Sequence, residues 1–204
     1  MLEDQLGQAV VHLSYPYGSF NEHVRESARE AGYRTAWSVQ SGLSQPSDDL
    51  LFGRLGTLDV VFLPRHGRHH RIPPIEINYR ANIDALKRAG VTDLISFSAC
   101  GSLREDCAPG HFVIVDQFID RTFARPKTFF ESGCVAHVSF GHPVSPLLGD
   151  MVEKACSDVG VTLHRGGTYI AIDGPQFSTL AESNLYRAWG CDVIGMTNMP
   201  EAKL

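Results

Sequence analysis

The sequence predicts an α/β fold in which strands and helices alternate along the chain. Short apolar runs typical of strands are separated by segments whose apolar residues recur every three or four positions, as in helices. Glycines and capping residues stand at the expected ends of several helices. The composition, 43% hydrophobic and 20% charged over 204 residues, is ordinary for a globular protein. Because α/β folds bind ligands at the carboxyl ends of strands, the loops after the strands are the candidate functional segments.

The amino-terminal part is expected to form a short strand–helix–strand unit. Runs over 10–13 and 35–39 predict two strands, and Asn21 is placed to cap a helix that ends at Gly32. The polar stretch over 40–48 contains glycine and proline and indicates a boundary.

The clearest alternation begins at residue 58. The apolar run over 58–63 predicts a strand covered on both faces, and the run over 91–97 predicts another. Between them we expect a helix that ends at Gly90. Its apolar positions are Ile75, Tyr79, Ile83 and Leu86.

The second half continues this pattern. Ser145-Pro146 and Gly160 mark the ends of one helix, with Leu148, Met151, Val152 and Ala155 on its apolar face. Thr179 and Glu182 form the capping box of another helix, which runs to Trp189. The end of the chain, 199–204, is expected to begin a further helix with Pro200 near its start. The remaining strands are expected over 112–115, 169–172 and 192–194.

Charge and cysteine content narrow the class of protein. A net charge of −5 and an isoelectric point near 6.0 argue against a nucleic-acid-binding protein. No apolar run is long enough to span a membrane, and no signal peptide is visible. The five cysteines are widely spaced, without a C-x-x-C pair, which favours reduced thiols in the cytoplasm over disulfides or a zinc site.

The basic segment RHGRHHR, over 65–71, directly follows the predicted strand 58–63. Arginine can pair with two oxygens of a phosphate at once, so an oxyanion site is the favoured interpretation. A solvated basic loop is one alternative. A metal site formed by His66, His69 and His70 is another, although the arginines would repel a divalent cation.

Three further loops follow predicted strands and carry suitable donors or an aromatic ring. Small residues and a hydroxyl over 98–102, and Thr197 after Gly195, could bind an anion. Phe177, in the turn 174–178, could stack on a flat base, or it could pack under the turn. Together these loops strengthen the case for a phosphate site.

Three long stretches of the chain resemble the trimeric purine nucleoside phosphorylase family. They read PRHGRHHRIPPIEINYRANIDALKRAG, SACGSLREDCAPGHFVIVDQFIDRT and IDGPQFSTLAESNLYRAWGCDVIGMTNMPEAKL. The resemblance covers 45–204 and implies a central mixed sheet flanked by helices. It also implies a pentosyltransferase of purine salvage, in which inorganic phosphate cleaves the glycosidic bond of a nucleoside. The resemblance implies no cofactor and no metal, and inorganic phosphate is a co-substrate.

The resemblance implies a role for several residues. The residues implied to bind phosphate are Arg65, His66, Ser98, Ala99 and Thr197. Cys100, Gly101 and Phe177 would flank the purine, and Met196 would lie against the ribose. His137 would enter the sugar pocket of a neighbouring subunit in a homotrimer. Ser178, where relatives specific for 6-oxopurines have Glu, implies the branch that converts S-methyl-5'-thioadenosine to adenine and 5-methylthioribose 1-phosphate. Enzymes acting on methylthioinosine remain an alternative.

The sequence also departs from the family pattern at two places. No glycine-rich phosphate loop precedes Gln45, and the strand with the adenine-binding acids is not found before Leu204. The residues that act as general acid are therefore not identified, and a catalytically inactive, truncated phosphorylase is the alternative function.

Residues 1–44 form a separate segment in this interpretation. The stretch LSYPYGSFNEHVRESAREAGYRTAWSV resembles part of a NodB-type polysaccharide deacetylase. The metal-binding Asp and the His-x-x-x-His motif of that enzyme are missing, so the resemblance implies a local fold, and deacetylation is the least favoured function.

Overall fold

The structure is a computed structural model that describes residues 12–14, 35–37, 46, 49–130 and 133–204. Near the amino terminus, β1 (His12–Ser14) and β2 (Thr35–Trp37) pair in parallel, at the two places where strands were predicted. The helix expected between them, and most of the predicted boundary over 40–48, lie outside the described residues.

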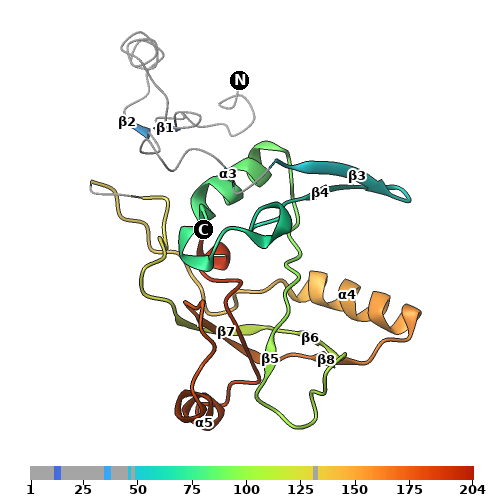
Figure 1. Cartoon of the computed structure of the whole chain (residues 1–204). Coiled ribbons are helices and arrows are strands. Elements are labelled where there is room, and N and C mark those ends of the chain that lie inside the picture. Colours follow the sequence, from blue (N-terminus) through green and yellow to red (C-terminus); the bar gives the residue numbers. More distant parts are fainter. Residues whose placement is uncertain (1–11, 15–34, 38–45, 47–48, 131–132) are drawn as a thin grey trace.

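A β-hairpin begins the main part of the structure. β3 (Leu51–Leu55) and β4 (Leu58–Phe62) pair antiparallel and extend away from the rest of the chain (Figure 1). The predicted strand is confirmed, but its predicted burial on both faces is wrong, because Leu58 and Phe62 are 64% and 60% exposed. The reason is that β4 pairs only with β3 in the described part of the chain.

The central sheet is mixed and has four strands in the order β5-β10-β9-β7. They are β5 (Gly101–Ser102), β10 (Val193–Gly195), β9 (Thr168–Ile172) and β7 (Gln117–Arg121). β9 runs parallel to both its neighbours, and β5 pairs antiparallel with β10. Beside this sheet, β6 (Phe112–Ile114) and β8 (Leu163–Arg165) form a parallel pair. The α/β fold with a central mixed sheet is thus confirmed.

The core lies on both faces of β9. Alternate residues of a strand point to opposite faces, and Ile170 packs with Leu103 and Tyr186 on one face. On the other, Tyr169 and Ala171 pack with Val193 and Met199. All of these side chains are buried. The middle of the sheet is therefore a rigid support for the loops that follow β9 and β10.

In the described part of the chain, three α-helices surround the sheets (Figure 1): α3 (Tyr79–Arg88), α4 (Pro146–Val159) and α5 (Leu180–Ala188). The predicted caps of α4, Ser145 and Gly160, are confirmed, as is the capping box of Thr179 and Glu182 on α5. Met151, on the predicted apolar face of α4, is 61% exposed, so this face is not fully buried.

Among the described residues, no helix has the length and apolar character to cross a membrane.

Two predicted elements differ from the structure. Residues 91–97 form no strand; the chain is largely exposed there, and it first pairs with another strand at Gly101. An extended segment without a partner leaves its backbone groups to solvent, so its apolar sequence alone does not make a strand. The helix expected from 75 to Gly90 is divided, with a short 3-10 turn at Pro74–Glu76 before α3.

An ion pair connects the carboxyl-terminal residues 201–204 to the central sheet. Residues Glu201–Lys203 form a 3-10 turn, η4, just after Pro200. The Lys203 ammonium donates to the buried Asp120 carboxylate of β7, which also accepts from Thr122 and Lys127. Burial opposes ionisation of Asp120, yet these hydrogen bonds hold its pKa far below the ordinary range. η4 is thereby fixed beside the loop after β10.

Candidate functional site

Arg65 connects the loop after β4 to the loop after β10. Its Nη1 donates to the Thr197 hydroxyl at 3.2 Å, and its Nη2 donates to the carbonyl of Met196 at 3.3 Å. Thr197 is buried. Two loops that are far apart in the sequence therefore meet at one guanidinium.

His66 lies beside Arg65 with both ring nitrogens engaged. Nδ1 is 2.7 Å from the carbonyl oxygen of Ile72, and Nε2 is 2.8 Å from Nη1 of Arg65. The carbonyl requires Nδ1 to donate and the guanidinium requires Nε2 to accept, which defines the neutral tautomer. Burial lowers the pKa of His66, and the charges of Arg65, His70 and Arg125 add to that effect.

Ser98 reaches the same site through Tyr169. The Tyr169 hydroxyl accepts a hydrogen bond from the backbone N–H of Thr197 at 3.1 Å and also interacts with the Ser98 side chain. A Cβ at Gly195 would lie 2.1 Å from that hydroxyl oxygen, so only glycine fits there. Burial raises the pKa of Tyr169. Its phenol, carried by β9, thus links Thr197 in the loop after β10 to Ser98.

Sequence analysis missed the layer beneath these residues. The guanidinium groups of Arg65 and Arg125 lie 5.7 and 5.3 Å from the ring centre of Tyr79. Burial raises the pKa of Tyr79 to about 12. Arg125 is buried and donates to four backbone carbonyls, of Ile172, Asp173, Met196 and Met199. It fixes the loops after β9 and β10, and no local motif marks it.

Glu201 was also missed, and it directly contacts the predicted site. Nε of Arg65 donates to Oε1 of Glu201 at 2.8 Å, and both side chains are less than one-fifth exposed. The other oxygen, Oε2, is buried without a hydrogen-bond partner. The pair leaves Nη1 and Nη2 directed toward Thr197 and Met196. Position 201 was assigned only to the start of a helix, so no sequence signal pointed to this role.

The other predicted residues are less closely gathered. Ala99, Cys100, Gly101 and His137 are exposed, and Phe177 is 90% exposed. The Met196 side chain lies against Gly174, where a Cβ would come within 2.2 Å of its sulfur. Ser178 shares a hydrogen bond with Ser183 at 2.8 Å. Of the residues assigned to the base, Cys100, Gly101 and Phe177 are therefore exposed in this single chain.

A cavity of about 410 Å³ lies elsewhere, between the loop after β5 and helix α5. Its wall includes Ser102, Arg104, Cys107, Ser183 and Arg187. None of the predicted phosphate or nucleoside residues lines it.

The alternative metal site of His66, His69 and His70 is not supported by the geometry. The rings of His66 and His70 are stacked, with their centres 4.1 Å apart. His66 has no ring nitrogen left for a cation, because Ile72 and Arg65 engage both.

The geometry can hold an oxyanion. Arg65, Thr197 and Ser98 bring charged and hydroxyl donors together, and neutral His66 holds the guanidinium. Hydrogen bonds from a charged guanidinium to a phosphate are roughly twice as strong as those between neutral groups.

The matching family model is that of the Phosphorylase superfamily, over residues 23–204. This chain belongs to the phosphorylase superfamily. It is 65% identical over 167 residues to an S-methyl-5'-thioadenosine phosphorylase of Rhodospirillum rubrum, covering 82% of this chain and 57% of the relative. A protein of the same name from Bradyrhizobium diazoefficiens is 53% identical over 197 residues, covering 97% of this chain and 66% of the relative.

Solved structures of methylthioadenosine phosphorylases are also similar to this chain. A methylthioadenosine phosphorylase from an antarctic soil metagenomic library superposes with a TM-score of 0.78 at 48% identity, covering 81% of this chain and 59% of that one. The methylthioadenosine phosphorylase of Schistosoma mansoni superposes with a TM-score of 0.76 at 37% identity, covering 80% and 66%. The chain thus spans 57–66% of the length of the curated relatives named above.

Proposed function

We propose that this chain binds inorganic phosphate at Arg65, His66, Ser98, Ala99 and Thr197 and uses it to cleave S-methyl-5'-thioadenosine. The products would be adenine and 5-methylthioribose 1-phosphate. The observation that carries the proposal is the convergence of Arg65 and Thr197 from separate loops. The names of the relatives support the substrate.

The chemistry would depend on position and charge. As the bond to the base breaks, the sugar develops positive charge, which a phosphate held close to it stabilises. Arg65 would hold the dianion, and Met196 would lie against the ribose. Phe177, Cys100 and Gly101 would contact the purine, with Ser178 at its edge. Phosphate is a co-substrate, and the proposal includes no cofactor.

A homotrimer is part of the proposal. Phe177 and His137 are exposed in the single chain, which fits residues that complete a site only when another subunit covers them. His137 would enter the sugar pocket of the neighbouring subunit. The five cysteines are unpaired, which supports a reducing, cytoplasmic location.

The test is phosphate-dependent release of adenine by the purified chain. We expect Arg65→Ala to lower kcat/KM at least about 100-fold, as loss of a donor to a developing anion does in other enzymes. Arg54→Ala, which alters an exposed arginine paired with Asp59 on the hairpin, is the matched control and should keep full activity.

The outcomes distinguish the two candidate functions. Release that requires phosphate and is lost only in Arg65→Ala supports phosphorolysis. If the folded chain binds phosphate through Arg65 but releases no adenine, phosphorolysis is wrong and the chain is a phosphate-binding, inactive phosphorylase. If it binds no phosphate, the site assignment itself is wrong.

A further inference from the structure

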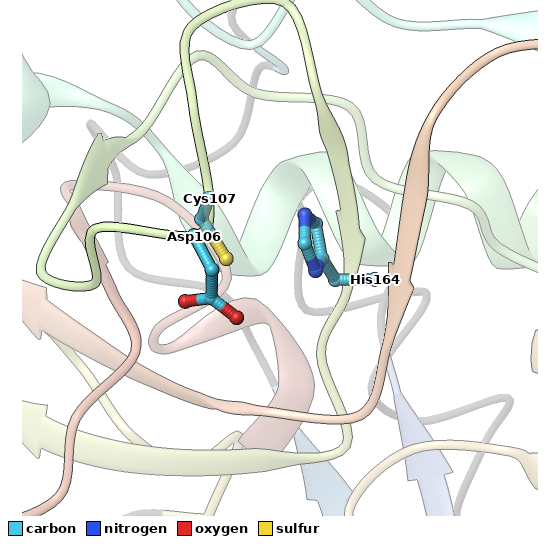
Figure 2. A group of neighbouring side chains, drawn as sticks. All are labelled: Asp106, Cys107 and His164. Carbon is cyan, nitrogen blue, oxygen red and sulfur yellow. The ribbon is translucent and has the colours of Figure 1, made fainter.

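A second group of chemically reactive side chains lies outside the proposed phosphate site. Asp106, Cys107 and His164 each offer one ligand atom, and these atoms all lie within 4.8 Å of one another (Figure 2). Asp106 and Cys107 come from the loop between β5 and β6, and His164 comes from β8, which pairs with β6. In the described part of the chain, this is the only such group of three.

The three residue types form a recognisable ligand set. A thiolate, an imidazole nitrogen and a carboxylate oxygen are the ligands that Zn²⁺ takes from proteins, and three of them with an open fourth position make a common zinc site. The thiol of Cys107 is buried, whereas Asp106 is more than half exposed, so a cation could enter past the carboxylate.

His111 determines which nitrogen of His164 is available. Nδ1 of His111 lies 2.9 Å from Nε2 of His164 and accepts a hydrogen bond from the backbone N–H of Ala108 at 3.3 Å. Since Nδ1 is an acceptor, Nε2 of His164 carries the proton that the pair shares. Nδ1 of His164 is then the nitrogen with a free lone pair, and its ring is oriented by a hydrogen bond at the opposite nitrogen, as in most metal-binding histidines.

Arg104 orients the carboxylate in the same way. Its Nε donates to Oδ1 of Asp106 at 2.9 Å and its Nη2 donates to Oδ2, while its Nη1 donates to Asp192 at 3.0 Å. Each carboxylate oxygen keeps a second lone pair for a cation. The arginine also offsets part of the negative charge that a thiolate and a carboxylate would place together.

A thiol nucleophile of the cysteine-protease type fits less well. That mechanism needs a carboxylate or amide on the far nitrogen of the imidazole. Here His111 occupies the far nitrogen, and Asp106 is held by Arg104.

We propose that Asp106, Cys107 and His164 bind one zinc ion, with His111 and Arg104 as the residues that orient two of its ligands. The ion would connect the loop after β5 to β8. Sequence analysis expected no metal because the cysteines lack paired spacing, but one cysteine suffices when a distant strand supplies the imidazole.

The test uses Co²⁺ as a spectroscopic probe of the purified full chain. We expect one Co²⁺ per chain, a thiolate-to-cobalt charge-transfer absorption, and loss of that absorption when Zn²⁺ is added in equal amount. Cys107→Ser should abolish the charge-transfer band. Cys156→Ser, which alters a half-buried cysteine of α4, is the matched control and should keep it.

Further variants keep the proposal testable if Cys107→Ser misfolds. His111→Phe removes only the residue that orients His164 and should weaken Co²⁺ binding about 10–100-fold. Arg65→Ala should bind Co²⁺ normally, which separates this site from the proposed phosphate site. Absence of a charge-transfer band in the unmodified chain, or its persistence in folded Cys107→Ser, would overturn the proposal.

Discussion

Arg65 is shared between a carboxylate and the loop that is proposed to hold phosphate. Glu201 neutralises its charge at Nε, while Nη1 and Nη2 face Thr197 and Met196. The carboxylate therefore has two opposite effects: it fixes the guanidinium, and it repels an incoming dianion. Which effect is larger can be measured with a substitution that removes only the charge.

Glu201→Gln is expected to tighten binding of inorganic phosphate roughly fivefold, which corresponds to removing about 1 kcal/mol of repulsion between partly exposed charges. The amide oxygen of glutamine can still accept the hydrogen bond from Nε of Arg65. Titration calorimetry with phosphate measures the change. Glu105→Gln, at a fully exposed carboxylate paired with Arg187, is the control. Weaker binding in Glu201→Gln would show that holding Arg65 is the main role of the carboxylate.

His66 makes stability depend on pH. Its pKa is lower in the folded chain than the ordinary 6.5, so the folded chain binds fewer protons than the unfolded chain. The stability that the folded chain gains from the lowered pKa of His66 is complete at pH values above the ordinary pKa. It is lost as the pH falls below that value. Urea unfolding should show that the stability of His66→Asn falls less than that of the unmodified chain between about pH 8 and about pH 5.5. His137→Asn, at an exposed histidine, should show the same pH dependence of stability as the unmodified chain. If His137→Asn weakened the pH dependence as much as His66→Asn does, the assignment of this dependence to His66 would be wrong.

The residues that follow strands could be predicted from the sequence, whereas those that support them could not. Arg65 and Thr197 stand in loops where an α/β fold presents ligands, and the structure brings them together. Arg125 and Tyr169 act through contacts with distant backbone and side chains, which leave no local pattern. Glu201 pairs with a residue over a hundred positions away in the sequence.

Helix α5 covers one face of the core, and its first turn is held by side chains. Tyr186 of this helix packs against Ile170 and Leu103. The Thr179 hydroxyl accepts from the backbone N–H of Glu182 at 3.2 Å, and the Glu182 carboxylate accepts from the backbone N–H of Thr179 at 2.7 Å. These hydrogen bonds to backbone N–H groups lower the pKa of Glu182.

Thr179→Ala should lower the free energy of unfolding by about 1 kcal/mol, because a backbone N–H of the first turn loses its acceptor. Chemical denaturation at neutral pH measures this. Ser157→Ala, inside helix α4, removes a hydroxyl that caps nothing and should change stability by about 0.5 kcal/mol or less. Equal losses in the two variants would mean that the capping box contributes nothing specific.

Helix ends were predicted more reliably than strand partners. The caps of α4 and α5 depend on a few neighbouring residues, so the sequence contains the information directly. A strand depends on hydrogen bonds to another segment. The run over 91–97 was predicted as a strand from its apolar residues and yet forms none. β4 begins at the predicted residue and ends one residue before the predicted end, but it lacks the predicted burial.

The molecule exposes large apolar side chains on the β3–β4 hairpin. Phe52, Leu55, Leu58 and Phe62 are 72%, 69%, 64% and 60% exposed. Clusters of exposed apolar residues mark surfaces that associate. Among the described residues, β3 and β4 pair only with each other, so the outer edge of each strand adds backbone groups that can pair with another chain.

Sedimentation velocity at increasing protein concentration should therefore show self-association of the unmodified chain. The double variant Phe52→Thr with Phe62→Thr should shift this association to higher concentration, since threonine keeps the strand propensity and removes most of the apolar area. Val159→Thr, at a single exposed position on α4, is the control. A monomer at all concentrations would contradict this prediction.

The pairing of strands in the sheet also sets the order in which the chain can fold during its synthesis. The strands β5, β6 and β7 pair with β10, β8 and β9, and in the described part of the chain none of the first three pairs with another of them. The ribosome therefore releases the first three strands before any of their partners exists. The apolar residues of these strands remain without their partner strands in the nascent polypeptide until residues 163–195 emerge. During that interval they are natural targets for chaperones that bind unfolded chains.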